Sequence, residues 1–286
     1  MRDTVTNLRV AVPSKGGLSG PAAEMLREAG YRQRDIGREL MLRDEENGVD
    51  FYFLRPRDVA VYVGSGTLDA GITGRDLLQD SGAAADEILA LDFGHSSFRL
   101  AVRPGAFAGV AGLNGARIAT SFAGILGKHL AESGIDAEVV HLDGAVENAV
   151  ALGVADAIAD VVETGGTLRQ AGLEPLGDPI MRSEAVLIAP TDGMVSELEP
   201  MVRRLQGVLT ARRYVMMDYD IRAEKVDDAC ALTPGIESPT VSPLHREGWV
   251  AVRAMVPRAE AQRIMDDLWL LGARGILVTD ILATRL

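Results

Sequence analysis

Short apolar runs alternate with segments of helical periodicity through the first part of this chain. The β-rich run 8–12 ends at Pro13, and after a glycine-containing turn the apolar residues recur at helical spacing until Gly30. The same alternation predicts further strands at 50–54 and 70–73, with helices at 56–63 and 74–80. Strands that alternate with short helices are typical of a mostly parallel α/β sheet.

A second round of the same pattern begins near Phe98. It predicts strands at 98–102, 117–120, 138–142, 157–162 and 185–189, and helices at 123–133 and 145–152. Apolar positions from Met194 to Leu209 then fit one long amphipathic helix. We therefore expect a second α/β lobe, with the long helix folding back on the first lobe.

The last part of the chain has a different order of elements. It reads as strand (214–221), helix (223–232), two strands (239–243 and 249–256), helix (258–272) and strand (275–281). This β-α-β-β-α-β order is typical of a ferredoxin-like module. The predicted domains are residues 1–97 with 190–213 as the first lobe, 98–189 as the second lobe, and 214–286 as the third domain.

Composition narrows the class of partner. The 286 residues are 47% hydrophobic and carry a formal net charge of −12, which opposes general binding to nucleic acid or to a membrane surface. Small anionic substrates remain open where basic groups gather locally. The single cysteine, Cys230, requires no oxidising compartment, the four histidines show no metal-ligand spacing, and no apolar stretch is long enough to span a membrane. We expect a cytoplasmic protein.

The most informative stretch runs from Asp156 to Leu168. An apolar strand ends near Asp160, and the turn Glu163-Thr164-Gly165-Gly166-Thr167 then opens a helix. Backbone N–H groups in such a turn can surround a phosphate, and Asp160 could hold sugar hydroxyls or a Mg²⁺ bound to the substrate. The alternative is an ordinary strand-to-helix turn in which Thr164 serves as the cap.

Weaker candidates lie at other strand ends. Each has a functional interpretation and a plain one. Lys15 and Gly16 follow the first strand and suit a phosphate, although a lysine in a surface turn is common. Arg55 and Arg75 could meet an anion, or could be surface arginines paired with Asp58 and Asp76. Glu147 begins a predicted helix, where its charge alone would favour the helix dipole.

Several enzyme classes are disfavoured because their motifs are missing from the sequence. The chain has no Gly-x-Gly-x-x-Gly fingerprint, no Gly-x-x-x-x-Gly-Lys-Ser/Thr loop and no Gly-x-Ser-x-Gly elbow. Dehydrogenases, P-loop ATPases and α/β-hydrolases are therefore poor matches.

Taken together, three segments resemble the ATP phosphoribosyltransferase family in its long, regulated form. They are Leu8–Gly16, Gly71–Asp76 and, most specifically, the run from Asp156 to Leu168, which resembles the family's signature for phosphoribosyl pyrophosphate. The resemblance extends from Leu8 to the end of the chain. It implies two periplasmic-binding-protein-like lobes of type II and an ACT-like regulatory domain that binds histidine.

The resemblance also implies a reaction, partners and site residues. The family joins the ribose of phosphoribosyl pyrophosphate to N1 of ATP, requires Mg²⁺, is inhibited by histidine and exchanges between dimer and hexamer. The implied catalytic residues are Asp160, Lys15 and Glu147, and phosphoribosyl pyrophosphate would contact Asp160 and residues 163–168, which are Glu163, Thr164, Gly165, Gly166, Thr167 and Leu168. The implied ATP contacts are Lys15, Gly16, Arg55, Arg75 and Asp76, and the implied histidine contacts are Asp220, Ser238 and Thr240.

A binding protein is the competing class. A cytoplasmic two-lobed sensor could use a cleft between the two predicted lobes to hold a phosphorylated metabolite. Transcriptional sensors of that type normally carry a helix-turn-helix and a basic face. We expect neither here, so the enzyme is the favoured interpretation.

Overall fold

The computed structural model describes residues 7–33, 39–193 and 195–285. The chain separates into two compact units, one made of the residues up to Glu24 with Tyr31–Glu199, and the other of Met25–Gly30 with the residues from Pro200 onward. Met194, the first apolar position of the predicted long helix, lies outside the described residues.

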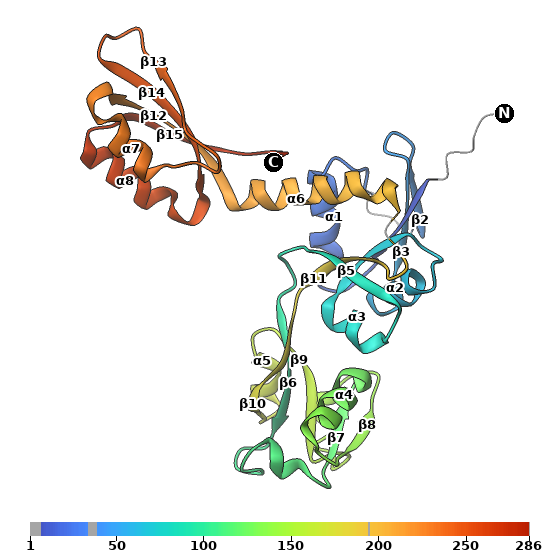
Figure 1. Cartoon of the computed structure of the whole chain (residues 1–286). Coiled ribbons are helices and arrows are strands. Elements are labelled where there is room, and N and C mark those ends of the chain that lie inside the picture. Colours follow the sequence, from blue (N-terminus) through green and yellow to red (C-terminus); the bar gives the residue numbers. More distant parts are fainter. Residues whose placement is uncertain (1–6, 34–38, 194, 286) are drawn as a thin grey trace, which may run out of the picture. The chain divides into compact units, whose positions relative to one another are not determined.

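The first lobe of the first unit is built on a six-stranded sheet in the order β2-β3-β1-β4-β11-β5 (Figure 1). β1 runs parallel to β3 and β4, whereas β11 is antiparallel to both of its neighbours. Apolar residues of α2 and α3 pack against β1 and β11 in a fully buried core. The elements are β1 (Leu8–Pro13), α1 (Ser19–Glu28, whose end belongs to the second unit), β2 (Met41–Asp44), β3 (Val49–Leu54), α2 (Pro56–Gly64), β4 (Ala70–Gly74), α3 (Arg75–Ser81), β5 (Ala85–Ala90) and β11 (Ala185–Pro190).

The second lobe repeats this plan with a five-stranded sheet in the order β10-β6-β9-β7-β8. Its sheet is covered on both faces, because Leu100 and Ala159 pack with α4 while Ala101 and Ile158 face the opposite side with Leu168 of α5. The elements are β6 (Ser96–Val102), β7 (Arg117–Thr120), α4 (Ala123–Ser133), β8 (Glu138–His141), β9 (Ala157–Val162), α5 (Gly166–Gln170) and β10 (Glu174–Ser183).

Two crossovers join the lobes, one from β5 to β6 and one from β10 to β11 (Figure 1). They are hydrogen-bonded to each other, since the Leu91 N–H donates to the Ala185 carbonyl at 2.9 Å and the Ala185 N–H donates to the Phe93 carbonyl at 2.8 Å. The strand after each crossover enters the sheet of the other lobe. This exchange explains why each sheet contains antiparallel strands among parallel ones.

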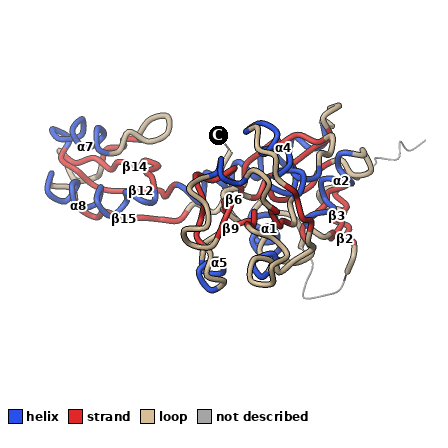
Figure 2. Tube along the Cα trace, turned by 90° about the horizontal axis from the view of Figure 1, so that it is seen from below, coloured by secondary structure: helices blue, strands red, loops and turns tan. Residues whose placement is uncertain are grey.

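The second unit contains α6 (Glu199–Arg213) and a four-stranded antiparallel sheet in the order β13-β14-β12-β15. Apolar side chains of α7 and α8 pack against one face of this sheet, and Figure 2 shows the strands in red beside the two helices in blue. The order is that of the predicted ferredoxin-like module. The elements are β12 (Tyr214–Arg222), α7 (Val226–Leu232), β13 (Thr240–Pro243), β14 (Trp249–Pro257), α8 (Ala261–Leu271) and β15 (Arg274–Asp280).

The predicted α/β class with two lobes and a ferredoxin-like module is confirmed, but three details differ. The sheets of the lobes are mixed rather than mostly parallel. β11, predicted in the second lobe, belongs to the first sheet. The predicted helix 145–152 is a 3-10 turn at Val146–Asn148 followed by turns, because Ala145 takes a left-handed conformation with φ of 50°.

No helix among the described residues combines the length and the apolar character that a membrane crossing requires.

Candidate active site

The predicted phosphate loop lines one wall of a pocket of about 300 Å³ in the second lobe. Asp160, which lies just before the loop, and Glu147, which is farther away in sequence, lie in the same pocket. The lining residues are Glu147, Asp160, Val161, Val162, Glu163, Thr164, Gly165, Gly166, Thr167 and Leu168. The structure therefore brings together every residue of the second lobe that the sequence singled out.

The loop leads into α5, whose N-terminus has no side-chain cap. Gly165 occupies the N-cap of α5 with φ of 72°, a left-handed conformation that favours glycine. No side chain caps the helix, so the alternative in which Thr164 serves as the cap does not describe this turn. The first N–H groups of a helix have no partner within it, and they are available to an anion in the pocket.

Arg169 adds a positive charge beside the loop. Its Nη2 donates to the Thr164 carbonyl at 3.4 Å, and its Nη1 would lie 3.2 Å from a Cβ built on Gly165. Arg169 was not among the site residues predicted from the sequence. Its position four residues after Gly165, one helical turn on, is the signal that could have indicated it.

Asp160 is a half-buried acid at the carboxyl end of β9. Burial raises the pKa of its carboxyl above the ordinary value, the negative charge of Glu147 raises it further, and the Val161 N–H donates to Oδ1 at 2.8 Å and opposes the shift. The structure gives Asp160 no cationic side chain as a hydrogen-bond partner among the described residues, whereas nearby Asp156 is paired with Arg117 at 2.9 Å. A perturbed acid in a pocket is typical of a functional site.

A second pocket, of about 500 Å³, lies between the two lobes and adjoins the first. Lys15, Gly16 and Asp76 of the first lobe line it, together with Phe122 and Glu163 of the second. Val161 and Glu163 line both pockets. The two pockets therefore meet at the end of β9.

Asp76 is held at the start of α3 by its surroundings. Its backbone N–H donates to Ser183 Oγ at 3.0 Å, and its Oδ1 accepts the Leu77 N–H at 2.9 Å. Burial raises the pKa of this carboxyl. A Cβ on Gly74 would collide with Oδ1, so the glycine of the motif Gly71–Asp76 leaves room for the acid.

The two arginines predicted for ATP do not join Lys15 in this second pocket. Arg55 is exposed at the N-cap of α2. Arg75 lines a different pocket and forms two 2.7 Å hydrogen bonds to Glu87 and one of 3.2 Å to Glu184. Arg75 therefore pairs with Glu87 and Glu184, and the predicted pairing of Arg75 with Asp76 is not observed.

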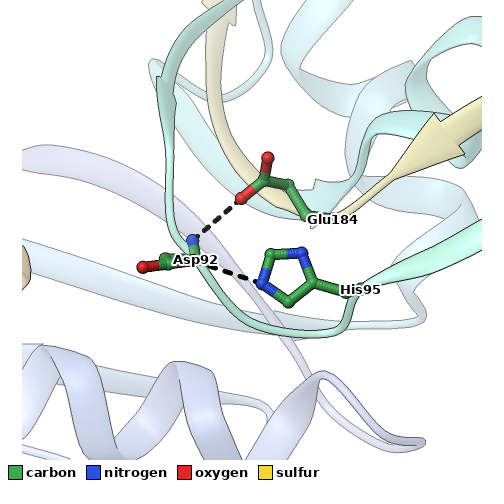
Figure 3. A group of neighbouring side chains, drawn as sticks. All are labelled: Asp92, His95 and Glu184. Carbon is green, nitrogen blue, oxygen red and sulfur yellow. Dashed lines mark hydrogen bonds and ion pairs between the residues drawn. The ribbon is translucent and has the colours of Figure 1, made fainter. Parts of the chain in front are cut away.

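Among the described residues, one group of three side chains has the spacing of possible metal ligands, and one of its members, His95, lines the second pocket. The ligand atoms of Asp92, His95 and Glu184, on the two crossovers, lie within 4.8 Å of one another (Figure 3). This group was not predicted, because Glu184 is far from His95 along the chain. Glu184 Oε2 accepts the Asp92 N–H at 3.0 Å, which connects the two crossovers, and Oε1 accepts from Arg75.

The predicted histidine contacts lie on or beside the sheet face opposite α7 and α8. Asp220 is on β12, and β14 separates it from Thr240 on β13. At about 4.8 Å per strand spacing, they are about 10 Å apart or more. Ser238 precedes β13 and is exposed. The structure thus places Asp220 and Thr240 on one face of the sheet but not in contact.

Comparison with known proteins adds a family to this geometry. The family model described as ATP phosphoribosyltransferase matches residues 55–207, and the model described as HisG, C-terminal domain, matches residues 211–283. ATP phosphoribosyltransferases from Streptomyces avermitilis and Streptomyces coelicolor are 66% and 64% identical, each over 98% of this chain and 100% of the relative. A chain of the ATP phosphoribosyl transferase (HisG:HisZ) complex from Thermotoga maritima superposes with a TM-score of 0.61 at 26% identity, covering 71% of this chain and 98% of that chain.

Proposed function

Because this chain belongs to the ATP phosphoribosyltransferase family, we propose that it transfers the phosphoribosyl group of phosphoribosyl pyrophosphate to N1 of the adenine of ATP. The bond between ribose C1 and the pyrophosphate oxygen breaks, and a bond from N1 to C1 forms. Pyrophosphate leaves with the bonding electrons. The product, phosphoribosyl-ATP, would begin histidine biosynthesis.

The observation that carries this proposal is the pair of adjoining pockets that share Val161 and Glu163. A reaction between two polyanionic substrates needs two sites that meet at the reacting atoms and hold them in alignment. The loop pocket would take phosphoribosyl pyrophosphate, and the pocket lined by Lys15, Gly16 and Asp76 would take ATP. The reacting atoms would then meet near the end of β9.

In the loop pocket, Gly165, Gly166 and Thr167 would bind the 5′-phosphate through backbone N–H groups and the threonine hydroxyl. Asp160 lies at the edge of this loop and would hold the ribose hydroxyls or a metal ion bound to the substrate. Glu147 faces the same pocket and keeps the local field negative, which would stabilise positive charge that develops on the ribose.

The acidic lining also suits Mg²⁺. Mg²⁺ usually binds one or two carboxylates together with substrate phosphates, and Asp160 with Glu147 or Glu163, which line this pocket, would supply them. When bound with the substrate, Mg²⁺ would stabilise the negative charge of the departing pyrophosphate. It would also reduce the repulsion between anionic substrates and a chain of net charge −12.

The ferredoxin-like module, residues 214–286, would bind histidine and inhibit the reaction. Asp220 would pair with the α-ammonium of histidine, and Ser238 and Thr240 would make polar contacts. We further propose that the protein forms homo-oligomers, from dimer to hexamer, and works in the cytoplasm. The domain roles follow, with the two lobes catalytic and the module regulatory.

Pyrophosphate release tests the proposal. The full chain is mixed with ATP, phosphoribosyl pyrophosphate and Mg²⁺, and parallel reactions omit one component at a time. We expect stoichiometric pyrophosphate and phosphoribosyl-ATP only in the complete mixture. Tight binding of either substrate without turnover in the complete mixture would instead support the two-lobed sensor.

A further inference from the structure

Helix α4 of the second lobe begins without a cap of its own. Its N-cap residue is Phe122, whose side chain makes no capping hydrogen bond. The acceptor comes from the first lobe, because Asp80 Oδ1 accepts the N–H groups of Gly124 at 2.9 Å and Ile125 at 3.3 Å. A carboxylate at the second and third N–H groups of a helix is the arrangement of a strong N-cap.

Arg57 completes this contact. Its Nη1 donates to Asp80 Oδ2 at 2.8 Å, and its guanidinium lies 4.8 Å from the centre of the Phe122 ring. The Asp80 side chain is only 9% exposed, so its charge is engaged on both oxygens. Arg57 on α2 and Asp80 on α3 thus hold the second lobe at one point.

Gly124 allows the close approach. A Cβ at this position would collide with the backbone carbonyl oxygen of Asp80, so a larger residue would push α4 away from α3. Gly127, one turn further along α4, has nothing within 4 Å of an added Cβ. An added Cβ would therefore clash with α3 at Gly124 but would meet nothing at Gly127.

The contact lies next to the pocket between the lobes. α3 carries Asp76 and Leu77 in that pocket and Asp80 one helical turn later, while Phe122, directly before α4, lines the pocket from the other lobe. The position of α4 against α3 therefore sets the position of Phe122 relative to Asp76.

We propose that Asp80 is a positioning residue that caps α4 across the lobe boundary and so aligns the two halves of the pocket assigned to ATP. The proposal rests on the proposed function for its kinetic readout. The loop pocket lies wholly in the second lobe, so binding of phosphoribosyl pyrophosphate alone should not depend on this contact. ATP affinity and kcat should depend on it.

The test compares Gly124→Ala with Gly127→Ala in the full chain. Gly127→Ala should keep kcat and both affinities. Gly124→Ala should lower kcat/KM for ATP at least tenfold while the Kd for phosphoribosyl pyrophosphate stays within about twofold. Asp80→Ala should act in the same direction, and Asp80→Asn, which can still accept both N–H groups, should restore most of the activity.

A distance measurement makes the result independent of turnover. Spin labels at Glu45→Cys and Ser133→Cys, in a Cys230→Ala background, report one position on each lobe by pulsed electron resonance. Gly124→Ala should shift or broaden the distance distribution, and Gly127→Ala should match the parent. A parent without turnover would refute the proposed function while this measurement still tests the contact.

Two results would overturn the positioning role. In the first, Gly124→Ala and Gly127→Ala have the same kinetic constants and the same spin-label distance distribution. The other is loss of phosphoribosyl pyrophosphate binding in step with kcat, which would mean that the substitution damages the second lobe itself.

Discussion

Asp160 on β9 and Asp156 directly before β9 are two acids with opposite consequences for stability. Burial raises the pKa of Asp160 in the folded state, whereas the Arg117 guanidinium lowers the pKa of Asp156 at the start of the same motif. An acid with a raised folded pKa favours folding in its protonated form, and this contribution is lost as pH rises through that pKa. At neutral pH the charge of Asp160 therefore works against folding, as is typical of a functional group.

We predict that Asp160→Asn lowers turnover on the order of 10²-fold but leaves the melting temperature at neutral pH equal or higher. The gain in stability should shrink as pH falls through the folded pKa of Asp160. Asp156→Asn is the matched control, and it should lower the melting temperature at neutral pH, lose that effect in acid and keep turnover. Near-normal turnover of Asp160→Asn with saturating Mg²⁺ would make Asp160 a structural residue.

Arg75 and Lys15 were grouped by sequence but are separated by structure. Arg75 is 22% exposed and bonds Glu87 and Glu184, and these contacts raise the pKa of its guanidinium, so the charge is engaged. We predict that Arg75→Ala costs about 1–2 kcal/mol of stability and leaves KM for ATP near the parent value. Lys15→Ala should raise KM for ATP and leave the stability near the parent value. Thermal melts and steady-state kinetics of both variants measure these two quantities. A raised KM for ATP in an Arg75→Ala variant of normal stability would assign Arg75 to the ATP site.

At the scale of elements, the sequence pattern predicted the buried strands and also the exposed edge strands β8, β13 and β15. It missed β2, β5 and β10, which also lie at sheet edges and contain exposed positions. The partner of β11 was also beyond reach, because an apolar run does not say which sheet it joins. The loop 163–167 was predictable because glycines and threonines at a strand end carry their geometry locally. Asp80 was not, since a cap supplied by another lobe leaves no mark in the sequence near α4.

The loop itself offers a comparison of adjacent glycines. Gly165 is left-handed, and Ala there should cost about 1–2 kcal/mol of stability. A Cβ on Gly166 meets only Thr164 Oγ1, at an ordinary 3.7 Å, so Gly166→Ala should fold normally and affect the pocket alone. We predict that Gly166→Ala raises the Kd for phosphoribosyl pyrophosphate without lowering the melting temperature.

Thr167→Ala tests the hydroxyl of the same loop. Loss of one hydrogen bond to a charged phosphate should weaken binding by about 1.5–3 kcal/mol. Calorimetric titration with phosphoribosyl pyrophosphate measures both loop variants. Parent-like affinity in Gly166→Ala and Thr167→Ala together would place the 5′-phosphate elsewhere.

At the scale of the whole molecule, the residues proposed for the reaction and those proposed for histidine binding fall on separate parts of the chain. The two pockets are lined by residues of the first unit, whereas the predicted histidine contacts lie in the second. Variants in the module should therefore change the response to histidine without changing basal turnover. For histidine to inhibit, it must bind one state of the protein better than another.

We predict that Asp220→Ala weakens histidine inhibition by about 1.5–3 kcal/mol, at least tenfold in the midpoint, because it removes the carboxylate proposed to pair with the α-ammonium. Asp228→Ala, which removes the same charge from exposed α7 on the opposite face of the sheet, is the control and should keep the parent midpoint. Inhibition titrations and sedimentation of both variants give the result. Any change of assembly that histidine induces in the parent should disappear in Asp220→Ala and persist in Asp228→Ala. An unchanged midpoint in Asp220→Ala would move the sensor to another part of the module, and an equal loss of basal turnover would assign Asp220 to folding or catalysis instead.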